Sequence, residues 1–403
     1  MINNNKNSIF RNISKTAAFA SGVFLLSMAT PVFAEDTAPD SSPVEVTLSY
    51  KADLIGNISG GLAKRGHHLD SLSLAADLDL DRLTGWSGGS AHLELLTNSG
   101  GAPNNSTGAA QGTDNIEVEG HYLRLYQAYV EQSLFDDRAN VRIGFSDLSG
   151  EFATADSSGW LVGPAFGMGP DFGGGGPGAS AYPSTSFGAR IWHQLGENGY
   201  AQVAATNART GVPGDHDGAD FSFDDGALFV AEAGWTGRGK LAIGAWAYGD
   251  RQPDLRDTNS AGDPVSRSSH GVYGVVEQPL HEATDAHGAL TAFARIGASD
   301  GKTGDLKGSL QAGLTLEPAL TSRPDSALSF GVSHLVFSDG YLDNGQDAGL
   351  DLSGSETVWE LTYSDLITDH VRLQPDIQYV RRPSGDHSIK DAVVVGLRLS
   401  VEF

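Results

Sequence analysis

Apolar and polar residues alternate strictly over long stretches of this chain. Between positions 391 and 403, the apolar side chains of Val393, Val395, Leu397, Leu399 and Val401 occupy every second position, and the chain ends in Phe403. A period of two indicates a β-strand with one apolar and one largely polar face. A strand of this length exceeds the usual strand of a soluble sheet and suits a tilted strand that crosses a membrane. A terminal aromatic residue fits the aromatic girdle of a membrane barrel.

The same alternation recurs at 71–82, 308–317 and 371–380, with charged residues on the face opposite the apolar stripe. In a soluble sandwich the apolar face would be the core. In a membrane barrel it faces lipid, and the polar face lines the lumen. Alternation alone permits both architectures. The strand length, the aromatic end and an export signal at the N-terminus favour the barrel.

We expect about sixteen strands in all, an all-β antiparallel transmembrane barrel. An even number is usual for a bacterial single-chain barrel, and about sixteen strands leave an aqueous channel. The predicted strands lie near 44–55, 69–82, 89–97, 118–134, 139–147, 186–195, 200–206, 226–236, 239–248, 270–280, 288–297, 307–316, 325–338, 354–366, 369–380 and 391–403.

The breaks between the predicted strands are short or long. Tight turns are predicted at 196–199 (GENG) and 236–239 (TGRG), and we expect them at the periplasmic end. Long polar, Gly-rich loops, expected at the extracellular end, lie at 98–117, 148–184, 208–225, 249–269 and 338–353. The longest contains GPAFGMGPDFGGGGPGASAYP at 163–183. A loop of this length is usually functional or disordered, so two readings stay open: a flexible outer loop, or a loop that folds inward and narrows the channel.

The first 34 residues have the pattern of a secretory signal. Lys6, Arg11 and Lys15 precede an apolar run at 17–29, and small or branched residues end at Ala34. The run is too short and too rich in small residues to span a membrane comfortably. We therefore predict a cleaved signal peptide at 1–34, export through the Sec pathway of a Gram-negative bacterium, a short acidic segment at 35–43 and the barrel domain at 44–403.

Charge and composition narrow the function. The chain carries 50 Asp and Glu against 26 Lys and Arg, a formal net charge of −24, so binding to nucleic acid through a basic patch is not expected. Cysteine is absent, so no disulfide stabilises the exported fold. The 12 histidines form no metal-ligand cluster, and His67 and His68 are predicted to lie at a turn. We expect neither a metal nor a cofactor.

The sequence carries little sign of an enzyme. A P-loop and an H-E-x-x-H pair are both missing. Ser333 and His334 form the one adjacent Ser-His pair considered for a barrel hydrolase, but neighbouring strand residues face opposite sides of a sheet. An enzyme is therefore not predicted.

Several stretches, in this order and spacing, resemble the OprB family of carbohydrate-selective porins. They are YKADLIGNISGGLAKRG (50–66), LSLAADLDLDRLTGWSGG (72–89), LRLYQAYVEQSLFDDRANVRIGFSDLSGEF (123–152), DGALFVAEAGW (225–235), GVYGVVEQPL (271–280) and LQPDIQYVRRPSG (373–385). The resemblance covers nearly the whole chain after residue 50. It implies a sixteen-stranded outer-membrane barrel through which sugars diffuse, with a constriction lined by charged and polar side chains.

The resemblance implies four constriction residues: Arg124, Arg142, Asp147 and Glu151. Alternation places Arg142 on the lumen side, opposite its apolar neighbours. Arginine offers a rigid fork of donors and carboxylates offer acceptors, which compensate a sugar for the hydration it loses in a narrow pore. The alternative is an Arg–carboxylate pair that only stiffens the wall.

Asp77, Asp79 and Asp81 share one stripe of a predicted strand. They either form a cation-attracting patch or are compensated by Arg65, Arg82 or another lumen arginine, and we favour compensation. Three functions remain open: passive diffusion of glucose-like mono- or small oligosaccharides, a general or cation-preferring porin for small hydrophilic solutes, and a structural barrel blocked by 163–183. Expected partners are carbohydrate solutes and outer-membrane lipid with lipopolysaccharide, and porins of this size often form homotrimers.

Overall fold

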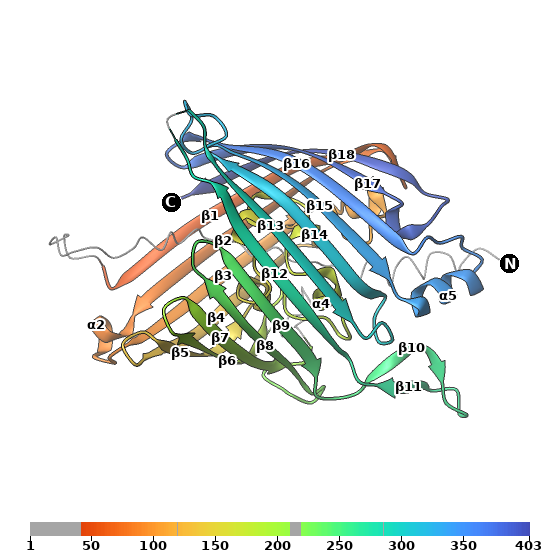
Figure 1. Ribbon diagram of the computed structural model, residues 1–403, viewed down its shortest axis with the longest axis horizontal. Helices are drawn as coiled ribbons and strands as arrows, with labels where there is room; N and C mark the ends of the chain where they lie inside the picture. Colours follow the sequence, from red (N-terminus) through yellow and green to blue (C-terminus); the bar gives the residue numbers. More distant parts are fainter. Residues whose placement is uncertain (1–41, 119, 210–218, 285) are drawn as a thin grey trace.

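The computed structural model describes residues 42–403 except 119, 210–218 and 285. The predicted signal peptide at 1–34 and most of the acidic segment at 35–43 lie outside the described residues. Within the described part, sixteen antiparallel strands form one closed barrel in which β1 pairs with β18 (Figure 1). The predicted fold class and strand number are confirmed.

The strands follow the chain around the barrel, and short helices interrupt the connections. The barrel strands are β1 (Val44–Gly61), β2 (Arg65–Asp79), β3 (Gly89–Gly100), β4 (Tyr122–Leu134), β5 (Ala139–Ser146), β6 (Ser186–Leu195), β7 (Gly199–Asn207), β8 (Ala227–Thr236), β9 (Lys240–Tyr248), β12 (His270–His281), β13 (Ala289–Ser299), β14 (Leu306–Glu317), β15 (Ala327–Phe337), β16 (Ser355–Thr368), β17 (Val371–Arg381) and β18 (Lys390–Glu402). The remaining elements are the hairpin β10 (Gln252–Thr258) and β11 (Pro264–Arg267), the helices α2 (Leu80–Thr84), α3 (Asn104–Thr107), α4 (Pro170–Gly173) and α5 (Asp339–Asp347), and 3-10 turns at Leu148–Gly150, Asp156–Trp160, Pro164–Phe166 and Pro383–Gly385.

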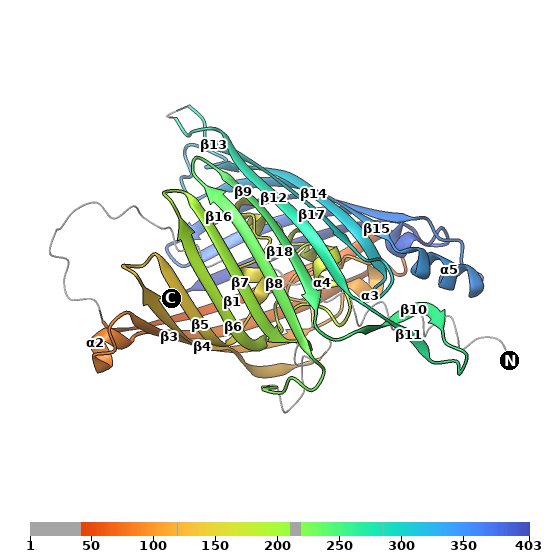
Figure 2. The ribbon, with the colours of Figure 1, turned by 60° about the horizontal axis from the view of Figure 1, so that its bottom comes forward.

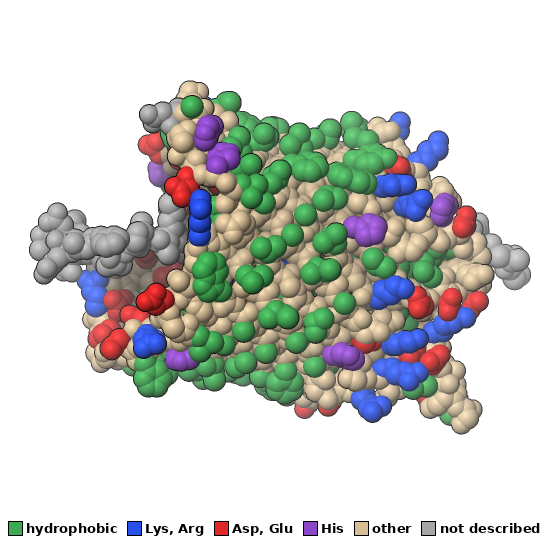
Figure 3. All heavy atoms as spheres, in the orientation of Figure 1, with side chains coloured by type: hydrophobic (Ala, Val, Ile, Leu, Met, Phe, Trp, Pro, Cys, Tyr) green, Lys and Arg blue, Asp and Glu red, His purple; other side chains and the backbone are tan. Residues whose placement is uncertain are grey.

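The barrel is apolar outside and polar inside. Ile243 and Ile296 on the outer face are 69% and 61% exposed, whereas Ser333, Gln311 and Glu356 on the inner face are fully buried. This is the reverse of a soluble protein, where large apolar side chains are buried. Figure 3 shows the apolar side chains as a broad field over the middle of the barrel, with charged side chains gathered at both ends. Lipid is the solvent that this surface fits.

All the long connections leave the barrel at one end, as predicted. That end carries α5 and the β10–β11 hairpin, and the tight turns at 196–198 and 237–239 lie at the other end (Figures 1 and 2). Long loops mark the extracellular end of such barrels and short turns the periplasmic end. None of the helices in the described residues is long and apolar enough to cross a membrane.

Two local predictions were wrong. The gap left between the predicted strands at 44–55 and 69–82 is a tight turn, because the Asn57 side chain donates to the carbonyls of Gly60 and Ala63 at 2.8 Å and the two glycines at 60 and 61 adopt positive φ. Strand β2 therefore begins at Arg65, and His67 and His68 lie within it rather than at a turn. The predicted loop at 249–269 also contains an additional hairpin, β10–β11.

Two long connections fold into the barrel rather than away from it. They are the inward loops 101–121 and 147–185, most of whose described residues are buried. Phe172 of the second loop stacks between Trp246 of β9 and Tyr273 of β12, with ring centroids 5.7 and 5.6 Å away. Figure 2 shows this loop, in yellow, inside the barrel behind β7 and β8. The segment 163–183 is therefore an inward-folded loop, which decides between the two alternatives left open by the sequence.

A charged residue on the lipid face tests the orientation of the strands. Leu314 of β14 is 41% exposed in the middle of the apolar field, and Leu320 in a periplasmic turn is 52% exposed. We expect Leu314→Arg to lower the free energy of folding into lipid vesicles by about 2–4 kcal/mol, because a cation at the bilayer midplane loses its hydration. Leu320→Arg is the matched control and should leave the urea midpoint near that of the wild type. Equal midpoints for both variants would contradict the assignment.

Candidate functional site

Glutamates on the inner wall accept hydrogen bonds from the backbone of the inward loops. Glu356 of β16 accepts from the backbone N–H of Ala110 at 2.7 Å and of Gln111 at 3.0 Å. Four residues further along β16, on the same face, Glu360 accepts from the backbone N–H groups of Val162 and Gly163. Both glutamates are almost completely buried. Each loop is thus attached to the same strand through charge-assisted bonds that satisfy buried donors.

Two more wall glutamates hold the second inward loop on the opposite side. Glu232 of β8 accepts from the backbone N–H of Ala153 at 2.8 Å and from the hydroxyl groups of Tyr200 and Tyr273. Glu277 of β12 accepts from the backbone N–H of Ser157 at 2.8 Å and from its hydroxyl. We call Glu232, Glu277, Glu356 and Glu360 the wall glutamates. They attach the loops across the lumen from β8 to β16.

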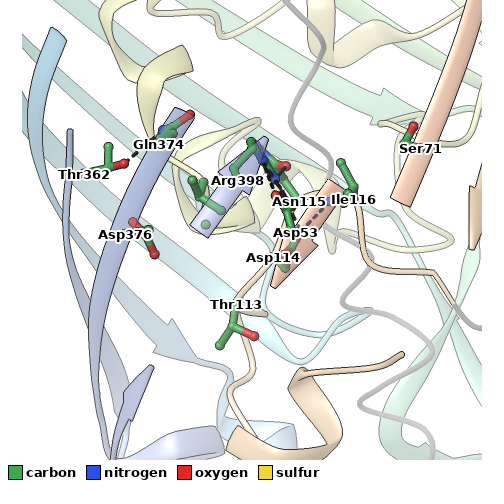
Figure 4. A network of polar contacts seen from close by, with 12 residues as sticks. Asp53, Ser71, Thr113, Asp114, Asn115, Ile116, Thr362, Gln374, Asp376 and Arg398 are labelled. Atoms are coloured by element: carbon green, nitrogen blue, oxygen red, sulfur yellow. Dashed lines mark hydrogen bonds and ion pairs between the residues drawn. The ribbon is translucent and has the colours of Figure 1, made fainter. Parts of the chain in front are cut away.

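The first inward loop also reaches the seam where the first and last strands meet. Arg398 of β18 donates to both carboxylate oxygens of Asp53 on β1, at 2.6 to 3.1 Å, and to the side-chain oxygen of Asn115 at 2.7 Å. Asp114 lies 3.4 Å from the same guanidinium. Figure 4 shows Asp53, Asp114 and Asn115 gathered at the end of the Arg398 side chain. A buried arginine therefore joins barrel closure to loop position.

Three acids in the inward loops are buried. Burial raises the pKa of Asp147 and of Asp171 to about 6, although the hydroxyls of Tyr126 and Ser309 donate to them and oppose the rise. Burial, reinforced by nearby Asp53, also raises the pKa of Asp114 well above its ordinary value. A raised pKa favours the protonated group in the folded state. The stability that Asp147 and Asp171 contribute is thus present below about pH 4 and lost as the pH rises through about 6.

Two water-accessible cavities lie near the short turns and are lined by residues of β1 to β9. One cavity of about 640 Å³ is lined by Asp137, Asn140, Arg142, Gly150, Glu151, Arg190, Trp192, Tyr200, Gln202, Thr236 and Lys240. A second, of about 450 Å³, is lined by Ser42, Pro43, Glu45, Asp77, Leu78, Asp79, Gly89, Ser90, Ala91, His92, Tyr129, Glu131 and Arg142. Arg142 borders both cavities. The second inward loop borders the larger cavity through Gly150 and Glu151.

Two arginines and two glutamates form a closed ring of ion pairs where the cavities meet. Arg142 of β5 donates to Glu131 of β4 at 2.8 Å and to Glu151 of the second inward loop. Arg190 of β6 donates to the same two acids, at 3.0 and 2.5 Å. These side chains retain 10–21% exposure, so they remain in contact with the water of the cavities. We call these four residues the ion-pair ring, and three of them come from the wall.

The structure brings together two of the four predicted constriction residues, Arg142 and Glu151. Arg124 lies elsewhere, donating to the carbonyl of Pro183 at 2.8 Å and packing over the ring of Tyr122. Asp147 is buried and accepts from the hydroxyl of Tyr126 at 2.7 Å. Both of these contact the ends of the second inward loop.

Sequence reasoning missed Glu131 and Arg190, the other half of the ion-pair ring. Each lies in a strand that was predicted correctly, at a position whose neighbours in the alternation face lipid. The alternation of apolar and polar positions could therefore have placed both residues in the lumen. Alternation does not show that a loop residue, Glu151, contacts Arg142 and Arg190.

Asp77 and Asp79 lie in β2, but Asp81 lies in α2, so the three acids do not form one stripe of a strand. Asp77 contacts His92 of β3 at 2.7 Å, while Asp79 accepts from the backbone N–H of Arg82 and caps α2, which contains Asp81. The predicted arginine compensation at Asp77 was wrong, because the cross-strand neighbour is a histidine. Among the described residues, no group of three His, Asp or Glu is placed to hold a metal ion.

Ser333 and His334 point to opposite faces of β15. The Ser333 hydroxyl donates to Gln111 inside the lumen, and His334 lies 2.9 Å from the hydroxyl of Thr357 on the outer face. They cannot act together. A sixteen-stranded barrel with a polar lumen, inward loops and charged water-filled cavities defines an outer-membrane diffusion porin, a channel and not an enzyme.

Comparison with known proteins supports this class. The profile of the carbohydrate-selective porin family, OprB, matches residues 63–403, and the chain belongs to that family. Porin B of Pseudomonas aeruginosa is 23% identical over 88% of this chain and 87% of its own length, and putative porin QuiX of Acinetobacter baylyi is 23% identical over 89% and 88%. The protein is thus a carbohydrate-selective porin of the outer membrane of Gram-negative bacteria.

Solved structures share the fold. The high-pH structure of Pseudomonas putida OprB is 23% identical, with a TM-score of 0.81 over 90% of this chain and 94% of that one. The outer-membrane channel DcaP of Acinetobacter baumannii has a TM-score of 0.51 at 12% identity, over 89% of this chain and 97% of that one. The barrel fold is therefore shared with channels whose sequences differ widely from this one.

Removal of Arg398 tests the connection between barrel closure and loop position. Arg398→Ala leaves Asp53 and Asp114 buried without the cation that both contact, and we expect a loss of about 3–5 kcal/mol. Thermal unfolding in detergent, followed by the shift in gel mobility of unheated protein, measures it. The control is Arg267→Ala in the exposed β10–β11 hairpin, which should not change the midpoint. An unchanged midpoint for Arg398→Ala would show that the seam does not depend on this pair.

Proposed function

We propose that glucose-like mono- and small oligosaccharides diffuse past the ion-pair ring, along the cavities lined by β1 to β9. The observation that carries the proposal is the position of Arg142, which borders both cavities and belongs to the ring. Glu131, Glu151 and Arg190 complete the proposed contact surface. Arg124 and Asp147 act as positioning residues for the second inward loop in this proposal, rather than as contacts of the sugar.

The ring suits a neutral polyhydroxyl solute. A sugar that enters the narrow region loses part of its hydration shell, and its hydroxyls then need both donors and acceptors. Guanidinium groups supply donors in a fixed plane and carboxylates supply acceptors. Because the two arginines already pair with the two glutamates, the ring presents many polar atoms with little net charge. Trp192, which lines the larger cavity, offers an aromatic face to the C–H surface of a sugar.

A second candidate is a preference for cationic solutes, favoured by the smaller cavity. Glu45, Asp77, Asp79 and Glu131 line it, against Arg142 and His92. This excess of acid concentrates cations near the periplasmic end. Zero-current potentials across planar bilayers in a potassium chloride gradient separate the two: a strong cation preference favours the second candidate, and a weak one favours the first.

Export and assembly remain predictions. We propose that residues 1–34 direct Sec export and are removed after Ala34, which intact-mass measurement of the mature protein would test. The homotrimer expected for a porin of this size predicts three times the protomer mass, detergent excluded, in light scattering. Contact with lipopolysaccharide is expected at the extracellular rim, where the apolar field ends.

Liposome swelling tests the sugar preference directly. We expect glucose to enter proteoliposomes several times faster than zwitterionic amino acids of similar size, because the ring offers hydroxyl partners without a net charge. Oligosaccharides should enter more slowly as their length grows. Rates ranked by solute size alone would contradict the sugar preference while leaving a diffusion porin.

The ring itself is tested by Arg142→Ala. Loss of the side chain shared by both cavities should widen the passage, raise single-channel conductance and bring the glucose-to-amino-acid ratio toward one. Arg138→Ala, in the exposed turn between β4 and β5, is the control and should keep the wild-type ratio. Arg142→Ala with wild-type conductance and an unchanged ratio would exclude the ring as the constriction.

A further inference from the structure

Five basic residues border the extracellular end of four neighbouring strands. Arg381 ends β17, Arg382 follows it, Lys390 begins β18, and Lys64 and Arg65 lie where β1 turns into β2. These strands are adjacent in the barrel. Lys390 pairs with Gly61 next to the turn, and Val380, beside Arg381, pairs with Ala392 near Lys390. The five residues, called here the rim cations, therefore form one continuous patch.

The rim cations differ from other basic residues at the same end. Within the described part of the chain, their side chains form no ion pair and no hydrogen bond. Several other cations at that end form ion pairs: Lys307 contacts Asp339 at 2.6 Å, Arg256 contacts Asp347 at 2.9 Å and Arg267 contacts Asp257 at 2.6 Å. In a chain with 50 acidic and 26 basic residues, a patch of cations without ion pairs is available for an anion from outside the chain.

The one acid in this patch is already engaged. The Asp391 carboxylate accepts from the hydroxyl of Tyr379 at 2.6 Å and from the backbone N–H of Arg382 at 2.9 Å. These bonds hold it against the barrel wall. All rim cations except Arg382 are exposed, and Arg382 is partly exposed. The patch thus presents positive charge to the surroundings.

An apolar surface begins directly below the patch. Arg381 lies on the same outer face as Tyr379 and Ile377, which are 40% and 46% exposed, and it lies about 7 Å beyond Tyr379 along the strand. On the neighbouring strands, Leu397 and Leu54 are also exposed and lie opposite each other. Figure 3 shows Lys and Arg side chains at the loop end of β15–β18, bordering the apolar field. Such a border is where lipid headgroups lie.

We propose that the rim cations bind the phosphate groups of a lipopolysaccharide molecule whose acyl chains lie along β17, β18 and β1. The chemistry combines two contributions. Arginines pair with phosphate through parallel N–H donors, and the apolar faces below accommodate hydrocarbon chains. Because the site faces the outer leaflet, the partner is a phosphorylated glycolipid rather than a solute of the channel. The proposal depends on the membrane location and not on the sugar preference.

Binding of purified lipopolysaccharide to detergent-solubilised protein tests the site. In Arg381→Ala/Lys390→Ala we expect the dissociation constant to increase on the order of tenfold or more, since each lost cation weakens attraction to an anionic headgroup. Arg138→Ala/Arg238→Ala removes two cations from the periplasmic turns and should stay within about twofold of the wild type. Glucose swelling should be unchanged in both variants, which separates this site from the channel. Equal affinities for wild type and Arg381→Ala/Lys390→Ala would overturn the proposal.

Two further measurements identify the ligand. Lipopolysaccharide stripped of its phosphates should bind the wild type and Arg381→Ala/Lys390→Ala equally, because the two removed cations then have no phosphate to bind. Displacement of lipopolysaccharide by millimolar inorganic phosphate alone would show a simple anion site and overturn the lipid assignment. Lys64→Ala/Arg65→Ala, at the turn on the other side of the patch, should also weaken binding of lipopolysaccharide. This second variant replaces Arg381→Ala/Lys390→Ala in the test if the latter does not fold.

Discussion

The wall glutamates are the interaction on which the rest of this porin depends. A lumen must be polar to admit water, yet two long loops occupy much of it, and their backbone N–H groups need partners once they leave solvent. Glu232, Glu277, Glu356 and Glu360 supply these partners from strands on opposite sides of the barrel. Without them the loops would exchange wall contacts for water and the passage would have no fixed width. The strands hold the four carboxylates in place, and the carboxylates in turn fix the positions of the inward loops.

The lumen is therefore divided between two kinds of packing. Along β8 to β13 the second inward loop builds an apolar core inside the barrel, in which Phe172 lies between two wall aromatics. Along β16 to β1 the first loop is held by buried charge, centred on Arg398. The remaining side keeps its polar side chains for water and solutes. The ion-pair ring lies at the boundary, because Glu151 comes from the loop and its three partners come from the wall.

Much of the fold could be predicted from the sequence, since period-two alternation reports one lipid face and one lumen face. It located the strands that carry Glu131, Arg142 and Arg190 and gave the lumen side of Arg142. Alternation carries no information on contacts between distant segments. The sequence therefore could not distinguish Arg124, which contacts the end of the second inward loop, and Asp147, the first residue of that loop, from residues that line the cavities. The turn after β1 was missed because a single side chain, Asn57, closes it with bonds that composition does not reveal.

The separation of the cavity lining from the loop contacts has an evolutionary consequence. The side chains that hold the inward loops and the side chains that line the cavities are largely different residues, even where they share a strand. Substitutions in the lining, around Trp192 and Tyr129, can change which solutes are admitted while the loops keep their positions. Substitutions at the loop contacts, around Trp246 or Glu360, change whether a passage of fixed width exists at all. A barrel organised in this way can acquire new specificities through few changes, which separates innovation in transport from the preservation of the fold.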